Sequence, residues 1–180
     1  ALLAIAAAEM AKQGLDAAAI LARLEAMRLR TFTWAMTRDL TMAVRGGRIP
    51  RWGKPLVKAL FLTPIAKVSP QGKLTVKGGL FGKRQTVRRF AEYVARRVDR
   101  TASYRVIIGH CGDLQAGQLL QEEFTRLVPC AQSWCVETGP AVGAHAIHAN
   151  DGAHRADDIE RHGNAKREAR WDAVLHGLQE

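Results

Sequence analysis

The residue types best suited to chemistry in this sequence are arginines and a histidine that stand close to glycines. Residues 45–49 read RGGRI, with Arg45 and Arg48 on either side of a glycine pair. Glycines leave backbone N–H groups accessible, so this stretch could hold an oxyanion or dock against an acidic surface. A glycine pair that ends a helix between solvated arginines would give the same letters, and both interpretations stay open.

A second stretch, residues 137–145, reads ETGPAVGAH and ends on a histidine after a run of small residues. Small residues let the backbone approach a ligand closely, and the imidazole of His145 can hydrogen-bond a carboxylate or a phosphate. A histidine with a purely structural role is the alternative. The pattern marks His145 as the candidate contact for an acid group.

Other kinds of site find little support in the sequence. There is no phosphate-binding loop, no nucleophile elbow and no GxGxxG run after a strand. His110 and Cys111 are adjacent at the end of a predicted strand, where neighbouring side chains face opposite ways, so the cysteine is interpreted as a core residue. The spacing of the later histidines matches no zinc site. We therefore expect no metal, no cofactor and no catalytic residue.

The charge is uneven along the chain. The 180 residues carry a net charge of +10, and residues 38–105 hold 17 Lys and Arg against 3 Asp and Glu. A basic middle suggests an anionic partner: nucleic acid, a phosphorylated ligand, a lipid head group or an acidic protein. A basic nucleic-acid-binding module is therefore the alternative function, although we expect the basic stretch to lack interleaved exposed aromatic residues.

Composition indicates a folded domain, with 47% hydrophobic and 24% charged residues. Three cysteines without CxxC spacing favour free thiols in a reducing cytoplasm. No apolar run approaches the ~20 residues that span a bilayer. The apolar start, residues 1–10, is interpreted as a helix cut from a longer chain rather than a signal peptide, because no basic region precedes it.

Hydrophobic periodicity predicts helices and strands in alternation. Helices are expected at residues 1–12, 16–30, 39–44, 56–61, 86–97 and 113–127, and strands at 31–37, 62–68, 73–76, 105–108 and 131–136. Gly78, Gly79 and Gly82 are expected in a flexible turn. Because residues 62–76 read as a hairpin, the predicted fold is α+β and two-layered, with helices packed on a mixed β-sheet.

The last 35 residues differ from the rest. They are rich in charge and histidine, and apolar periodicity returns only near Trp171, Val174, Leu175 and Leu178. The predicted division is therefore a domain over residues 1–145 and a divergent polar tail over 146–180, either a peripheral helix or disordered.

Taken in order, these segments resemble a known family. An alanine-rich helix, a leucine-rich helix, a strand, RGGRI, a Thr-Pro-Ile strand, a basic Gly-Lys turn, an amphipathic helix and GPAVGAH follow one another. The series resembles the second domain of DegV proteins, the fatty-acid-binding subunits of bacterial fatty acid kinase, over residues 1–145. RGGRI together with the GPxxGxH pattern carries most of this resemblance.

The resemblance implies a lipid-binding protein rather than a complete enzyme. In that family two lobes clasp one fatty acid, whose acyl chain enters a tunnel in the second lobe. Hydroxyl residues of the first lobe and the histidine of GPxxGxH, here His145, hold the carboxylate. A separate ATP-dependent kinase subunit phosphorylates the acid, and Arg45 and Arg48 match a turn that faces it. The apolar residues expected to line the tunnel are Phe32, Trp34, Met36, Leu40, Leu60, Phe61, Ile65 and Ile107.

Two departures from the family pattern follow. The sequence has no counterpart of the N-terminal lobe, which we expect to be supplied by another part of the same protein. The family continues from the histidine into a GPG turn and a final strand, whereas residues 146–152 read AIHANDG. The last strand is therefore expected to be missing or replaced.

Overall fold

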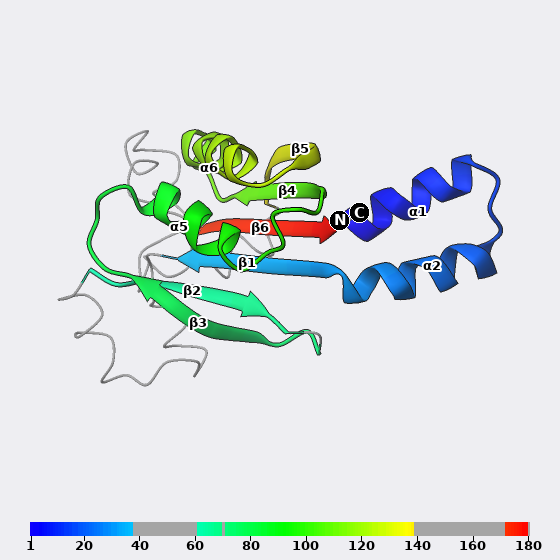
Figure 1. The fold of residues 1–180 in the computed structure, drawn as a ribbon, viewed down its shortest axis with the longest axis horizontal. Coiled ribbons are helices and arrows are strands. Elements are labelled where there is room, and N and C mark those ends of the chain that lie inside the picture. The colour runs from blue at the N-terminus through cyan, green and yellow to red at the C-terminus, as the bar shows by residue number, and fades with distance from the viewer. Residues whose placement is uncertain (38–60, 70, 139–171, 180) are drawn as a thin grey trace, which may run out of the picture.

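The computed structural model describes residues 1–37, 61–69, 71–138 and 172–179. Within these residues, helices pack on a mixed sheet whose strands run in the order β3-β2-β1-β6-β4-β5 (Figure 1). Neighbouring strands are antiparallel except β4 and β5, which are parallel. The predicted α+β fold with helices on a mixed sheet is thus confirmed. The strands are β1 (Thr31–Thr37), β2 (Thr63–Val68), β3 (Leu74–Leu80), β4 (Tyr104–His110), β5 (Cys130–Glu137) and β6 (Asp172–Gln179).

A helical hairpin precedes the sheet and extends beyond one of its ends (Figure 1). It consists of α1 (Leu2–Lys12) and α2 (Ala17–Leu29). Gly14 follows α1 with φ of +83°, a conformation that favours glycine. The Asp16 carboxylate accepts a hydrogen bond from the Ala19 amide at 2.7 Å and so caps α2, at the residue where the sequence analysis begins this helix.

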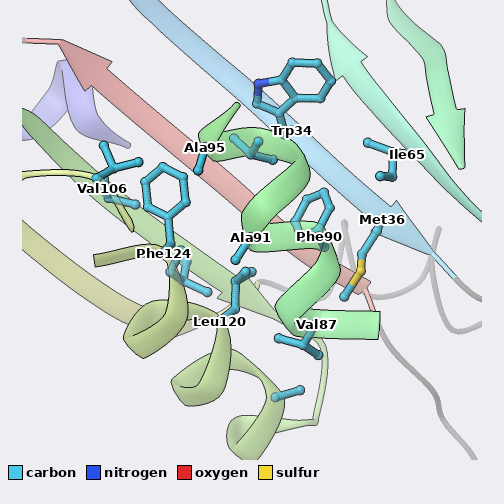
Figure 2. Packing of buried hydrophobic residues seen from close by; sticks show 14 of the residues in the cluster. Trp34, Met36, Ile65, Val87, Phe90, Ala91, Ala95, Val106, Leu120 and Phe124 are labelled. Atoms are coloured by element: carbon cyan, nitrogen blue, oxygen red, sulfur yellow. The ribbon is translucent and has the colours of Figure 1, made fainter. Parts of the chain in front are cut away.

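The main core lies between one face of the sheet and helices α5 (Thr86–Ala95) and α6 (Leu114–Leu127). Apolar residues at helical spacing turn one side of α5 inward, including Val87 and Phe90, and α6 contributes Leu120 and Phe124. Figure 2 shows these side chains meeting Trp34, Met36 and Ile65 from β1 and β2. The core therefore fixes how the helices sit on the strands.

The opposite face of the sheet meets the start of α1. Leu2 packs there against Ile107 of β4 and Leu178 of β6, all of them buried. The Arg105 guanidinium, on the same face of β4 as Ile107, donates two hydrogen bonds to the Glu9 carboxylate at 2.7 and 2.6 Å. An apolar contact and an ion pair thus attach α1 to the centre of the sheet.

One prediction about glycines is wrong. Gly78 and Gly79 lie inside β3 rather than in a turn, and only Gly82 has a positive φ, of +80°. A Cβ at Gly78 would lie 2.6 Å from the Tyr93 hydroxyl oxygen, and one at Gly79 would lie 2.5 Å from Leu62 Cδ1. These two glycines therefore serve close packing against neighbouring side chains, which the sequence pattern does not distinguish from a turn.

The prediction of a peripheral helical or disordered tail is wrong for residues 172–179. They form β6, which pairs with the whole of β1 on one side and the whole of β4 on the other. A strand is therefore present at the end of the chain, at the centre of the sheet. Its short apolar pattern suits a helix or a strand equally, so periodicity could not identify it. Residues 146–171 and the proposed boundary at 145 lie outside the described residues.

Candidate functional site

Several strands end or begin together at one edge of the sheet. Thr37, the last residue of β1, is in register with Asp172, the first residue of β6. His110, the last residue of β4, is in register with Ala173 of β6 and with Glu137, the last residue of β5. We call the row formed by Thr37, Asp172, His110 and Glu137 the site edge.

The two sequence stretches with candidate site residues are continuous with the site edge. Residues 38–60, which contain RGGRI, follow β1, and residues 139–171, which begin with the GPAVGAH run, follow Thr138 at the end of β5. The edge is therefore the place on the fold to which both stretches are attached. The residues His145, Arg45, Arg48, Leu40 and Leu60 themselves lie outside the described residues.

Thr138 joins the ends of β4 and β5 at this edge. Its backbone N–H donates a hydrogen bond to the His110 carbonyl at 2.8 Å, and its hydroxyl donates to the same oxygen at 3.1 Å. The Cys111 Sγ atom lies 2.8 Å from the Thr138 hydroxyl oxygen. A hydroxyl has one proton, so the thiol is the donor in this last contact. The residue that precedes the GPAVGAH run is thus held by three hydrogen bonds.

The His110 side chain is buried beside α6, with 7% of the residue exposed. A Cβ on Gly117 of α6 would lie 2.9 Å from His110 Cδ2 and 2.8 Å from Cys135 Sγ, so glycine is needed where this imidazole sits. The Nδ1 atom of His110 is buried and has no hydrogen-bond partner among the described residues. One signal for this residue exists in the sequence: a histidine that ends an apolar strand, the position where sheet proteins often place ligand contacts.

Part of the predicted acyl-chain lining comes together in the structure. Trp34, Met36 and Ile65 belong to the core beneath α5 and α6, with exposures of 4%, 1% and 0%. Phe32 packs against the same cluster, and its ring centroid lies 5.7 Å from that of Tyr104. These four side chains share one face of the sheet, and their contact with an acyl chain stays a prediction.

Two other predicted lining residues lie elsewhere. Ile107 is on the opposite face of the sheet, where it packs against Leu2 and Leu178. Phe61 is 51% exposed, and the Lys83 ammonium nitrogen lies 4.2 Å from the centre of its ring. Neither residue belongs to the cluster formed by Trp34, Met36 and Ile65, because the alternation of β4 turns Ile107 away and Phe61 precedes β2 at the surface.

The basic residues in α5 and just after it contact other parts of the protein. Arg88 bonds the Glu123 carboxylate at 2.7 Å. Arg89 donates to the Phe81 carbonyl at 2.6 Å, and the Arg97 guanidinium carbon lies 3.5 Å from the centre of the Tyr93 ring. These contacts give the cations structural partners, although most of them remain at the surface. They weaken the case for a row of arginines devoted to phosphates.

Glu123 is a buried carboxylate that links the two core helices. It accepts hydrogen bonds from Arg126, in the same helix, at 2.6 Å and from Arg88 of α5 at 2.7 Å. The Arg126 and Arg88 guanidinium groups hold the pKa of this carboxyl below its ordinary value, and the bond to Glu123 raises the pKa of Arg126. Glu123 therefore forms an ion-paired contact between two helices and has the features of a structural carboxylate.

The cysteines and acidic residues form no metal-binding cluster in the described part of the chain. None of the three cysteines takes part in a disulfide. Burial raises the pKa of Cys130 to about 11 and also raises the pKa of Cys135, which keeps both as protonated thiols near neutral pH. No group of three or more His, Cys, Asp or Glu residues with metal-binding geometry occurs among the described residues.

Comparison with known proteins identifies related sequences and folds. A family model described as "Uncharacterised protein, DegV family" matches residues 1–152. No protein with a curated description matches the chain. Within the described residues, no helix has the length and apolar character needed to cross a membrane.

Solved structures share the fold at low sequence identity. A fatty acid binding DegV family protein from Streptococcus agalactiae is 17% identical, with a TM-score of 0.68, over 99% of this chain and 55% of that chain. The fatty acid kinase B3 protein from Streptococcus pneumoniae, loaded with linoleic acid, is 16% identical, with a TM-score of 0.70, over 99% and 54%. A DegV family protein from Corynebacterium glutamicum is 19% identical, with a TM-score of 0.69, over 98% and 58%. The chain thus spans about half the length of the structures that it matches.

Proposed function

The chain belongs to the DegV family, and on that premise we propose that it binds a long-chain fatty acid and presents the acid group to a separate ATP-dependent kinase subunit. The observation that carries the proposal is the family match over residues 1–152. It is supported by the shared fold with the linoleic-acid-loaded kinase B3 protein of Streptococcus pneumoniae.

The physical chemistry of such a ligand has two requirements. Each buried CH₂ group of an acyl chain contributes about 0.8 kcal/mol. The carboxylate still needs hydrogen-bond donors or a cation once it leaves water. We assign the apolar requirement to the side of the sheet that carries Phe32, Trp34, Met36 and Ile65, together with Leu40 and Leu60 of the stretch that follows β1.

The polar requirement falls to the stretches attached at the site edge. His145 is the proposed carboxylate contact of this chain, and hydroxyl residues of an N-terminal lobe of the same protein supply the others. Arg45 and Arg48 are the proposed contacts for the kinase subunit, because guanidinium groups beside a Gly-Gly pair can stay hydrated and meet an acidic surface. In this proposal the chain holds the lipid and the partner transfers the phosphoryl group.

The first experiment asks whether a lipid is carried at all. Native mass spectrometry of the full-length protein should show added mass equal to one long-chain fatty acid, and added oleate should raise the melting temperature of delipidated protein. Protein that releases no acyl species on organic extraction and is not stabilised by oleate would contradict the proposal. Sequence-specific DNA binding at physiological salt would favour the nucleic-acid alternative instead.

The second experiment separates the two sets of residues. His145→Ala should weaken oleate retention, because a carboxylate loses a donor worth about 1.5–3 kcal/mol. Arg45→Ala and Arg48→Ala should retain oleate but raise the apparent KM in a coupled assay with the kinase subunit, more strongly at low salt. The assignment is wrong if the arginine variants lose lipid while His145→Ala keeps it and is phosphorylated normally.

A further inference from the structure

One buried nitrogen of His110 makes no hydrogen bond with the described residues. The residue is 7% exposed, and its Nδ1 atom lacks a hydrogen-bond partner among the described residues. Buried polar atoms are nearly always paired, because an unpaired one loses its bond to water without compensation. The imidazole also packs closely against α6, because a Cβ on Gly117 would lie 2.9 Å from its Cδ2 atom. An unpaired atom on a closely packed ring calls for a partner from outside these residues.

The unpaired nitrogen of His110 lies on the side of the ring away from Gly117 of α6. Cδ2 and Nδ1 lie on opposite sides of the ring axis, and Cδ2 is the atom nearest to Gly117. Nδ1 is therefore turned away from α6 and from Cys135, which borders the same glycine on β5.

The strand register places His110 in a row of residues that ends in apolar core residues. His110 is in register with Ala173 of β6, Ala173 with Met36 of β1, and Met36 with Ile65 of β2. Residues directly opposite on neighbouring strands share a face. His110 and Met36 are two strand spacings apart, roughly 9.5 Å between backbones. An imidazole thus stands at one end of a row whose other end is the predicted acyl-chain lining.

A carboxylic acid with a long apolar chain matches that row in both parts. An imidazole N–H at Nδ1 can donate to a carboxylate oxygen, and Met36 and Ile65 offer only apolar contact. Thr138, at the same end of β4, donates its N–H and hydroxyl to the His110 carbonyl. Glu137, next to His110 in register, is exposed, so water screens its repulsion of a second carboxylate.

We propose that the His110 imidazole, through Nδ1, is a second histidine contact for the acid group of the bound lipid, in addition to His145. This assignment rests on the proposed function, because it names a further group at the same ligand. It also explains the position of His110: the hydrogen bonds from Thr138 place the start of the His145 stretch directly beside it.

The test uses two substitutions at one position in the full-length protein. His110→Asn keeps a polar group where Nδ1 lies, whereas His110→Phe keeps a planar ring of similar size and removes the polar atom. The Phe variant should raise the Kd for oleate about 10- to 100-fold, as expected for a lost hydrogen bond to a charged group. The Asn variant should recover most of that loss. With oleate labelled with ¹³C at C1, the carboxyl resonance should move in the Phe variant and stay near the wild-type position in the Asn variant.

Two controls keep the result independent of folding. Cys135→Ala changes packing beside the same glycine without touching Nδ1, and it should leave the Kd for oleate unchanged. In wild-type protein labelled with ¹⁵N at histidine, the Nδ1 resonance of His110 should shift when oleate is added, a readout that needs no variant. Wild-type Kd in the Phe variant, or an Nδ1 resonance that oleate leaves unmoved, would overturn the assignment. Wild-type protein that binds no oleate would overturn the proposed function itself.

Discussion

Glu123 shows how one residue can join two helices. The residue is 4% exposed, and its carboxylate accepts hydrogen bonds from Arg126 within α6 and from Arg88 of α5. The two guanidinium groups remain 62% and 46% exposed. A buried anion between two cations that keep their water avoids most of the desolvation cost of a fully buried ion pair. The charge of Glu123 therefore stabilises the α5–α6 contact.

This arrangement predicts a pH-dependent stability difference. Because Arg126 and Arg88 lower the pKa of the Glu123 carboxyl below its ordinary value of 4.5, its charge stabilises the folded state above that value. The contribution is lost as the pH falls through the lowered pKa, when the folded protein also takes up the proton. Glu123→Gln should therefore be less stable than wild type at pH 7, and the difference should shrink toward zero in acid.

Urea unfolding of both proteins between pH 7 and pH 2 measures this difference. Glu122→Gln is the matched control, because the neighbouring carboxylate is exposed and it should change the free energy of unfolding little at any pH. A difference between wild type and Glu123→Gln that stays constant down to the lowest pH would show that shape, rather than charge, is responsible.

At the scale of elements, the α1–α2 hairpin depends on a few contacts with the sheet. α2 has no buried residue, and its Leu21 and Leu29 are 62% and 74% exposed. Isolated helices of about 11 to 13 residues are only marginally stable in water. Leu2 and the Glu9–Arg105 ion pair therefore provide the attachment that keeps α1 in place.

Leu2→Ala should loosen this attachment. Removal of a buried leucine side chain costs about 2–5 kcal/mol, and here much of the loss should appear as local opening of α1. Hydrogen exchange of the α1 amides and urea unfolding report the two effects separately. Leu21→Ala is the matched control on α2: its side chain is 62% exposed, so it should change stability by no more than about 0.5 kcal/mol. Equal exchange rates in the two variants would mean that Leu2 does not anchor the hairpin.

The elements that local chemistry determines were predictable from the sequence. The helices predicted at residues 1–12, 16–30 and 113–127 have bounds close to those observed, and Asp16 and Asp113 cap two of them. The strand over residues 31–37 has the predicted bounds. Local patterns do not predict the position of a residue that depends on contacts with residues distant in the sequence. Gly78 and Gly79 resemble turn glycines in the sequence. In the structure they lie in a strand, where Tyr93 and Leu62 leave no room for larger residues. Ile107 differs from the other predicted lining residues because the alternation of β4 places it on the opposite face of the sheet, where it packs against Leu2.

The candidate site was predictable in part for the same reason. RGGRI and GPAVGAH are local patterns, and they identify Arg45, Arg48 and His145 without reference to the fold. His110 belongs to neither of these patterns. The register of β4, β5 and β6 brings it to the site edge beside Thr138. Strand register depends on long-range pairing, which no local pattern specifies.

At the scale of the whole molecule, the sheet depends most on β6, the strand that the sequence pattern does not identify. β6 pairs with every residue of Thr31–Thr37 and of Tyr104–His110, and so joins β3-β2-β1 to β4-β5. Phe32 lies across Gly177 so closely that no side chain would fit there, and Leu178 is 1% exposed. A strand in this position connects the two halves of the sheet, and its residues pack on both faces of the sheet.

A chain that ends at residue 171 should therefore fail to fold cooperatively. Without β6, the backbone groups of β1 and β4 that face it lose their partners, and two central strands become exposed edges. Circular dichroism during heating should show no sharp transition for residues 1–171. A synthetic peptide of residues 172–180 should restore the transition by strand addition, whereas a scrambled peptide of the same composition should not, because register and the glycine opposite Phe32 are lost. A truncated chain that melts sharply near the wild-type temperature would show that β1 and β4 can pair without β6.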